Sequence, residues 1–237
     1  MVVASAVNEQ GEEIYPRKWN HEFIDLPQVA NQRTPTFTVE EVPKIVSAAE
    51  GQLRVLYALL SGTGLRIGEA LALEVRDISE GTITVRRAVW NGIVQTPKTF
   101  SGFRDVDVHP ALAAVVKAHI GERASGFFFQ SPSAKPLSPS NIRNRSLHPI
   151  LKAMGRETCG FHSFRRFRVT HLRKNRVPED LIRFWIGHAD KSVTDGYSKV
   201  KDDVSFRMVC GKRGAWVRAS KSGSRVKNRS CTHLYPK

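Results

Sequence analysis

The stretch ITVRRAVW (residues 83–90), followed by Asn91-Gly92 and by IVQT (residues 93–96), decides the fold class. Apolar and polar residues alternate along both segments, which is the pattern of half-buried β-strands. Asn-Gly is a favoured pair for the tight turn of a β-hairpin. A third alternating segment, FRDVDV (residues 103–108), follows the polar loop PKTFSG. These three segments are predicted to form one small three-stranded antiparallel sheet.

Helical patterns surround this predicted sheet. TVEE (residues 38–41) is a capping box, and the helix that it opens is expected to continue through VPKIVSAAE. Apolar residues recur at helical spacing from Leu53 to Leu60, and the glycines of GTG then end that helix before LRIGEALAL starts another. Further helices are predicted at ALAAVVKAHI, NIRNRSLHPILKAMG, HSFRRFRVTHLRKN and PEDLIRFWIG. The predicted fold class is therefore α+β, mainly helical with one small sheet.

The charge balance indicates the kind of partner. The 237 residues include 37 Lys+Arg and 22 Asp+Glu, which gives a formal net charge of +15. Such an excess of positive charge suits a polyphosphate, so nucleic acid is the predicted partner. The length and an ordinary globular composition predict one domain with irregular ends.

The two ends of the chain differ from its middle. Residues 1–34 carry five acidic and three basic residues without periodicity, and we expect a linker or a remnant there. Residues 211–237 carry eight basic residues and no acidic one. That composition is typical of a solvated, disordered tail, and auxiliary contact with phosphate is the alternative. The folded domain is predicted to span residues 35–210.

Cysteine usage and hydropathy indicate the compartment. Cys159, Cys210 and Cys231 lie too far apart for a paired metal motif, and their odd number suits no disulfide framework. No segment approaches the roughly 20 apolar residues of a membrane span, and the first residues do not read as a secretion signal. We therefore expect a cytoplasmic protein without membrane association.

The segment GTGLRIGEA (residues 62–70) superficially suggests a dinucleotide-binding loop. Its glycines are spaced GxGxxxG and not GxGxxG, and helical periodicity precedes them where that fold requires a strand. The chain also contains no P-loop motif. We therefore predict neither a nucleotide cofactor nor ATP-driven chemistry.

The predicted helix from His162 has two different faces. One sector contains Phe161, Phe164, Phe167 and His171, whereas another contains His162, Arg165, Arg166, Val169 and Arg173. His162 and Arg165 stand one turn apart, so both side chains can reach oxygens of one phosphate. Arg166 and Arg173 are predicted to contact DNA from the same sector. A solvated basic face is the alternative interpretation of this pattern.

Five separated elements then occur in a characteristic order. Arg66 follows a glycine turn, Lys98 lies in a loop between strands, and the His162–Arg165 pair is followed by His188 in IGHAD and Tyr197 in VTDGYSKV. In this order the chain resembles the catalytic domain of the tyrosine recombinases, the phage-integrase type of site-specific DNA recombinase. The resemblance extends from about Thr36 to about Met208.

The resemblance implies roles for the reacting groups. Tyr197 would attack a DNA phosphodiester and form a 3′-phosphotyrosyl bond, releasing a 5′ hydroxyl. Arg66 and Arg165 would stabilise the charge that develops on the phosphate oxygens, a task that two arginines can perform without a metal ion. Glu69 would orient Arg66, although a surface ion pair at this spacing is the alternative.

The resemblance also implies proton donors and acceptors. Lys98 would protonate the leaving oxygen, whereas its alternative is an ordinary loop lysine. His162 and His188 match the two histidine positions of the family. One would assist proton transfer and the other would bind a non-bridging oxygen, and the sequence does not assign these two tasks.

The resemblance implies a site-specific recombinase or integrase that acts on double-stranded DNA as a homotetramer, with no metal, cofactor or ATP. A type IB topoisomerase and a non-catalytic DNA-binding remnant are the alternatives. The family normally has a helical DNA-clamping domain before the catalytic one, and the residues before Thr36 are too few to form it. We therefore expect a fragment, a remnant or a minimal form that binds DNA weakly and in a salt-sensitive manner.

Overall fold

The structure is a computed structural model that describes residues 8, 10, 34–96, 102–188 and 199–213. The chain divides into two compact units, Met1–Thr34 and Pro35–Lys237, and the helices and strands of the described residues belong to the second unit. The predicted linker up to residue 33, apart from residues 8 and 10, lies outside the described residues. So do Lys98, Tyr197 and the tail beyond Arg213.

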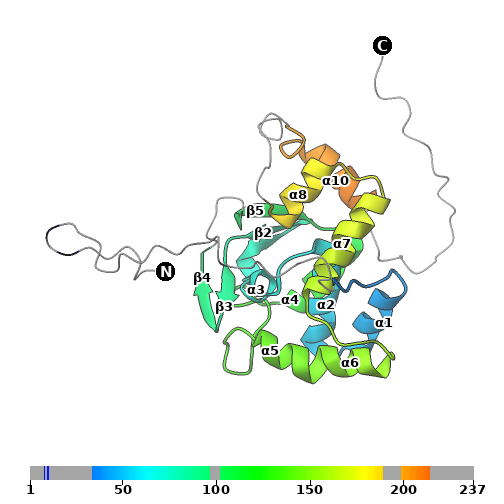
Figure 1. The fold of residues 1–237 in the computed structure, drawn as a ribbon. Coiled ribbons are helices and arrows are strands. Elements are labelled where there is room, and N and C mark those ends of the chain that lie inside the picture. The colour runs from blue at the N-terminus through cyan, green and yellow to red at the C-terminus, as the bar shows by residue number, and fades with distance from the viewer. Residues whose placement is uncertain (1–7, 9, 11–33, 97–101, 189–198, 214–237) are drawn as a thin grey trace, which may run out of the picture. The chain divides into compact units, whose positions relative to one another are not determined.

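Helices dominate the second unit, as predicted (Figure 1). They are α1 (Glu41–Ala48), α2 (Gly51–Thr63), α3 (Ile67–Leu71), α4 (Pro110–Ile120), α5 (Pro139–Ile142), α6 (His148–Ala153), α7 (His162–Lys174), α8 (Glu179–Ile186) and α10 (Val204–Arg213). A 3-10 turn, η4 (Val75–Asp77), follows α3, and a π-helical segment, η6 (Arg143–Leu147), joins α5 to α6. Among the helices of the described residues, none combines the length and apolarity needed to cross a bilayer.

Within the described residues, the strands form two antiparallel sheets instead of the single predicted one. β1 (Ile78–Ser79), β2 (Thr82–Val85) and β5 (Arg104–Asp107) form a three-stranded sheet in the order β1-β2-β5. β3 (Ala88–Trp90) and β4 (Ile93–Gln95) form a separate hairpin. The prediction that residues 83–96 form one hairpin paired with 103–108 is therefore wrong, although the mainly helical α+β class is confirmed.

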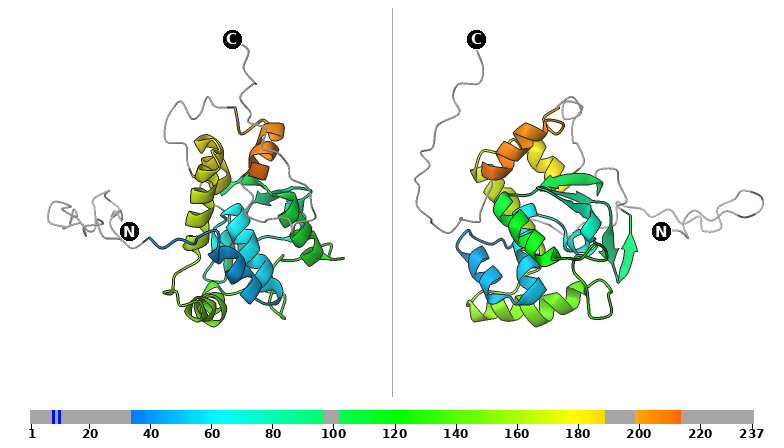
Figure 2. Two further views of the ribbon diagram at one scale, coloured as in Figure 1. Left: turned by 90° about the vertical axis from the view of Figure 1, so that its right-hand side faces the viewer. Right: turned by 180° about the vertical axis from the view of Figure 1, so that it is seen from behind.

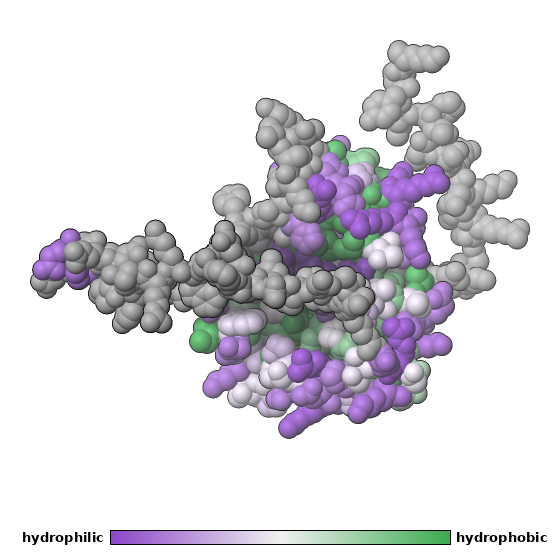
Figure 3. Space-filling model, in the orientation of Figure 1, coloured by the Kyte–Doolittle hydropathy of each residue, from purple (hydrophilic) through white to green (hydrophobic). Residues whose placement is uncertain are grey.

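Burial explains why residues 83–90 divide into two strands. Ile83 and Val85 of β2 are buried in the core, and Ile83 pairs with buried Val106 of β5. The β3–β4 hairpin instead leaves Trp90 and Ile93 exposed, and apolar surface is visible over it in Figure 3. The apolar surface of β2 therefore favours pairing with β5 over continuation into the hairpin.

The local turn and cap predictions are confirmed. Asn91 and Gly92, between β3 and β4, both have positive φ angles, 49° and 78°. At the start of α1, the Thr38 N–H donates to Glu41 Oε2 at 2.9 Å, and the Glu41 N–H donates to Thr38 Oγ1 at 3.3 Å. These reciprocal bonds form the expected capping box.

The core is built around α2. Leu56, Tyr57, Leu59 and Leu60 are fully buried there, and α1, α4 and α7 all pack against this helix (Figures 1 and 2). Phe164 of α7 stacks on the Tyr57 ring with 5.5 Å between centroids. The apolar sector predicted for the helix from His162 is thus the face that holds α7 on α2.

Candidate active site

Arg66 and Glu69 form an ion pair at the start of α3. Arg66 caps the helix in an extended conformation, and its N–H donates to Glu69 Oε2 at 2.9 Å. Its guanidinium Nη1 donates to Glu69 Oε1, also at 2.9 Å. The Arg66 side chain is 43% exposed and that of Glu69 is 7% exposed. Arg66 therefore keeps an accessible guanidinium on a buried carboxylate.

Arg165 of α7 joins the ends of two other helices. Its Nη1 donates to the Gly64 carbonyl at 2.9 Å, and its Nη2 donates to the Ile186 carbonyl at 2.6 Å. Gly64 ends α2 and Ile186 is the last residue of α8. Carbonyl groups at helix C-termini carry partial negative charge, so this environment stabilises the buried cation. Arg165 is buried, unlike the exposed residue that a solvated basic face would provide.

Gly64 allows these helix ends to meet. Its φ is 72°, and an added Cβ would lie 2.6 Å from Ile186 Cδ1 and 3.1 Å from Arg168 Cγ. A side chain would therefore be strained and would also separate α2 from α8. This glycine places Leu65 and Arg66 directly beside Arg165.

Arg104 of β5 is a member of the cluster that the sequence prediction missed. Its Nη2 donates to Glu69 Oε2 at 2.9 Å and its Nη1 to Oε1 at 3.2 Å. Arg104 shares a strand face with buried Val106, because side chains two residues apart in a strand point the same way. An arginine on the apolar face of a predicted strand was the signal that could have revealed it.

The electrostatics of the cluster favour an anion. Burial and the charge of Arg66 lower the pKa of Arg165 to about 9, with Glu69 opposing this shift. Burial of Glu69 opposes its ionisation, but Arg104 and Arg66 outweigh burial and lower the pKa of this carboxyl. At neutral pH the three guanidinium groups and one carboxylate leave two net positive charges.

The two predicted histidines lie at the margins of this cluster. His162 begins α7, where its side chain is only partly covered. This partial burial, followed by the charges of Arg165, Arg166 and Arg66, lowers its pKa below 6.5. The neutral imidazole is therefore favoured at pH 7. His188 is exposed and lies two residues after Ile186, whose carbonyl binds Arg165.

The two predicted DNA-binding arginines have protein partners. Arg166 Nη1 donates to the Pro35 carbonyl at 3.1 Å. Arg173 is exposed, and its Nε donates to Glu179 Oε2 at 3.0 Å as part of a two-bond ion pair. Contact with a DNA phosphate at Arg173 would compete with Glu179.

The structure brings Arg66, Glu69, His162 and Arg165 together from segments remote in sequence. Lys98 and Tyr197 lie outside the described residues. In sequence, Lys98 falls between β4 and β5, and Tyr197 falls between α8 and α10. Lys98 thus precedes, in sequence, the strand that begins with Arg104, and Tyr197 follows the helix whose last carbonyl binds Arg165.

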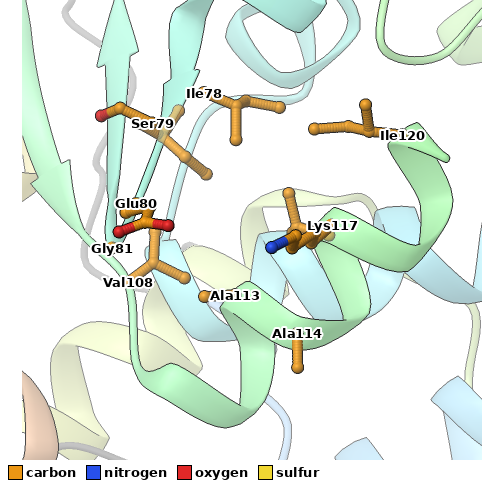
Figure 4. Close-up of a pocket in the computed structure, with 11 residues that line it drawn as sticks. Ile78, Ser79, Glu80, Gly81, Val108, Ala113, Ala114, Lys117 and Ile120 are labelled. Atoms are coloured by element: carbon orange, nitrogen blue, oxygen red, sulfur yellow. The ribbon is translucent and has the colours of Figure 1, made fainter. Parts of the chain in front are cut away.

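A metal-binding cluster and a ligand-sized cavity are the other features that could mark a functional site. Within residues 34–96, 102–188 and 199–213, no three His, Cys, Asp or Glu side chains gather in a way that could hold a metal ion. A cavity of about 460 Å³ lies between the β1–β2 turn and α4, where Ile78, Lys117 and Ile120 line it (Figure 4). Arg66 and Arg165 are not among its lining residues, so this cavity is separate from the arginine cluster.

Comparison with protein families decides the affiliation of this domain. Residues 35–203 match the model of the phage integrase family, and these residues are most of the chain. The chain belongs to the phage integrase family. The match begins at the first residue of the second compact unit and includes every residue of the arginine cluster.

Individual relatives support this affiliation. The tyrosine recombinase XerC of Mesorhizobium japonicum is 31% identical over 195 residues, covering 75% of this chain and 59% of the relative. A XerC-like tyrosine recombinase of Caldanaerobacter subterraneus is 27% identical over 190 residues, covering 67% of this chain and 48% of the relative. The chain thus spans about half the length of the relatives it matches.

Solved structures share the fold. The Tn1549 transposon integrase, in complex with a circular intermediate DNA, has a TM-score of 0.59 at 18% identity and covers 70% of this chain and 61% of that one. The integrase of mycobacterium phage Brujita has a TM-score of 0.58 at 15% identity, with coverage of 81% and 63%. The phage integrase fold therefore accommodates this chain despite low identity.

Proposed function

We propose that this chain is the catalytic domain of a site-specific recombinase that cleaves and rejoins double-stranded DNA through Tyr197. The observation that carries the proposal is the cluster of Arg66, Arg165 and His162 around buried Glu69. Two segments remote in sequence, the start of α3 and the first turn of α7, supply these groups, and their surplus positive charge suits a phosphodiester. Family membership and the net charge of +15 support the same substrate.

The proposed first step is attack of the Tyr197 hydroxyl oxygen on a DNA phosphorus. A bond forms between the phenolic oxygen and phosphorus, and the bond to the 5′ oxygen breaks, leaving a 3′-phosphotyrosyl link. The equatorial oxygens gain negative charge in the transition state. Arg66 and Arg165 are the groups that stabilise this charge, and no metal ion is required for it.

Proton transfer completes the step. The phenol loses its proton as it attacks, and the 5′ oxygen gains a proton as it leaves. Lys98 is proposed as the acid for the leaving oxygen, because it matches the family's lysine acid at its place in the sequence between β4 and β5. His162, which favours the neutral form at pH 7, suits acceptance of a proton or a hydrogen bond near the nucleophile. His188 is proposed to bind a non-bridging oxygen.

The phosphotyrosyl bond conserves the energy of the broken phosphodiester. A DNA hydroxyl can therefore attack it and reseal the strand without ATP. Exchange of strands between two duplexes needs several copies of the protein, and we propose that the protein acts as a homotetramer. Arg166 and Arg173 are proposed as additional phosphate contacts at the edge of the site.

The direct test uses DNA that traps the covalent intermediate. The chain is incubated with nicked half-site DNA, taken from a panel that includes DNA flanking its own gene, and products are separated on a denaturing gel. A protein–DNA adduct is expected for the wild type and for Tyr57→Phe, which removes a buried hydroxyl bonded to Ser146. Tyr197→Phe should form none. An adduct that persists in Tyr197→Phe would remove this residue from the role.

The alternatives give different outcomes. A type IB topoisomerase-like activity would relax a supercoiled plasmid without exchanging partners, whereas a recombinase would join two marked duplexes. A non-catalytic DNA-binding remnant would shift DNA in a native gel and give neither product. Relaxation without joining, or binding without an adduct, would therefore replace the recombinase proposal.

A further inference from the structure

Arg104 occupies a position where a charged residue needs a specific reason. It stands opposite Val85 in the three-stranded sheet, on the face that also carries Val106. Its side chain is only 1% exposed. A guanidinium in such a place is unfavourable unless hydrogen bonds and an opposite charge compensate its loss of water. The partners of Arg104 therefore indicate what it does.

One side of Arg104 fixes the Glu69 carboxylate. Glu69 Oε1 accepts from Nη1 of both Arg66 and Arg104, at 2.9 and 3.2 Å. Glu69 Oε2 accepts from the Arg66 N–H and from Arg104 Nη2, each at 2.9 Å. Both oxygens are thus shared between an accessible arginine and a buried one. The position of Arg66 therefore depends on a carboxylate that is itself fixed by two hydrogen bonds from buried Arg104.

The other side of Arg104 fixes the end of α8. Its Nε donates to the Trp185 carbonyl at 2.8 Å. The next carbonyl along the chain, that of Ile186, accepts from Arg165. Arg104 and Arg165 therefore bind consecutive carbonyls, immediately before Gly187 and His188.

Gly187 supplies a second observation on the same contact. Its φ is 70°, and an added Cβ would lie 2.7 Å from Arg104 Nη1 and 2.8 Å from Cζ. The chain that leads to His188 thus passes directly over the guanidinium. Any other residue at 187 would be strained and would also displace Arg104.

We infer that Arg104 is a positioning residue, which sets the distance between Arg66 at the start of α3 and the α8 end that binds Arg165 and precedes His188. It need not touch DNA for this task. Its guanidinium connects both halves of the cluster through Glu69 and the Trp185 carbonyl. This inference rests on the proposed function, because its effect is read out in DNA cleavage.

The test compares single-turnover adduct formation in Arg104→Lys and the wild type, together with DNA affinity and the urea midpoint. Lysine keeps the charge but cannot bridge both Glu69 oxygens and the Trp185 carbonyl. We expect the rate to fall at least about tenfold, with DNA affinity within about twofold. Gly187→Ala should produce the same pattern. Arg123→Lys is the matched control, since half-buried Arg123 also bonds backbone carbonyls, at Ile120 and Phe128, and should keep the wild-type rate.

A double-mutant cycle separates positioning from general stabilisation. If Arg104 acts through Glu69, then Arg104→Lys should cost little further rate in a Glu69→Gln background. Losses that multiply in the double variant would overturn the inference, as would an Arg104→Lys rate within twofold of the wild type. An equal loss in Arg123→Lys would overturn it too. Absence of any wild-type adduct would instead remove the proposed function, and the inference with it.

Discussion

Strand β5 carries two buried arginine–carboxylate groups that differ in charge and in access. At its first residue, Arg104 joins Arg66 and Glu69, and Arg165 lies close enough for its pKa to respond to all three. At its last residue, Asp107 accepts two bonds from Arg207 of α10, at 2.9 and 3.0 Å, and one from Trp185 Nε1 at 2.7 Å.

The second group, around Asp107, is shielded from solvent and has no net charge. One carboxylate meets one guanidinium, the Arg207 side chain is 9% exposed, and its guanidinium also lies over the Phe184 ring. The first group has a surplus of cations and an accessible Arg66. Buried polar groups of the same type therefore serve different tasks: the Asp107 group fastens α8 and α10 to the sheet, whereas the Arg66 group presents charge. Substitutions in each group in turn test this difference.

The largest effect is expected on stability, when the carboxylate of the buried Asp107–Arg207 pair is removed. Asp107→Ala would leave the Arg207 guanidinium buried without its counter-charge, and should lower the free energy of unfolding by about 3–5 kcal/mol. Urea denaturation measures this loss. Asp105→Ala is the control on the same strand, because half-buried Asp105 accepts one bond from Thr84 and should cost much less. Equal losses in both variants would contradict the assignment.

Removal of the accessible arginine should affect the rate more than stability. Arg66→Ala is expected to slow adduct formation about 100- to 1,000-fold, by analogy with the loss of one preorganised donor to a transition-state anion. The urea midpoint should change little because Arg66 is 43% exposed. Arg76→Ala, which removes an exposed arginine paired with Glu74, is the control. A near-normal rate in Arg66→Ala would show that the accessible arginine does not stabilise the transition state.

The salt dependence of DNA binding offers a smaller but independent test. If Arg66 neutralises a phosphate, Arg66→Ala should reduce the slope of log K against log salt by about 1. Arg123→Gln removes the same charge at the end of α4 and should leave the slope unchanged. Fluorescence anisotropy over a range of salt concentrations measures both slopes. A change of equal size in Arg123→Gln would show that net charge alone determines the slope.

The smallest effect concerns His162. Because its folded pKa lies below 6.5, the neutral form persists to lower pH than in the unfolded chain. Its contribution to stability is therefore present above pH 6.5 and is lost as pH falls through the folded pKa. Arg166→Gln removes one neighbouring positive charge and should raise the pKa of His162 toward 6.5. An NMR titration of the imidazole that places the wild-type pKa above 6.5 would contradict this account.

The features that a few neighbouring residues specify were predicted correctly from the sequence. The Thr38–Glu41 capping box and the Asn91-Gly92 turn are specified by a few adjacent residues, and both are present. The pairing of β2 with β5 is not local. Arg86 and Arg87 are adjacent polar residues that interrupt the alternation between Val85 and Ala88, where β2 ends and β3 begins. This interruption shows that the strand divides there, but it does not show which strand β2 pairs with. Burial of Ile83 against Val106 decides that pairing.

The same distinction applies to the site. Arg66, His162 and Arg165 belong to motifs with recognisable spacing, so their grouping could be proposed from order along the chain. Arg104 belongs to no such motif, and its bonds reach Glu69 and Trp185, which are remote in sequence. Its apolar strand face was the available signal, and only tertiary contacts show what it binds.

In the proposed reaction, Tyr197 attacks a phosphodiester that the arginine cluster holds. Mass spectrometry of the trapped adduct after proteolysis and nuclease digestion tests it most directly. We expect a nucleotide attached to the peptide that contains Tyr197, at a yield that falls sharply in Arg66→Ala and Arg165→Ala. A nucleotide on any other residue, or an unchanged yield without either arginine, would contradict it.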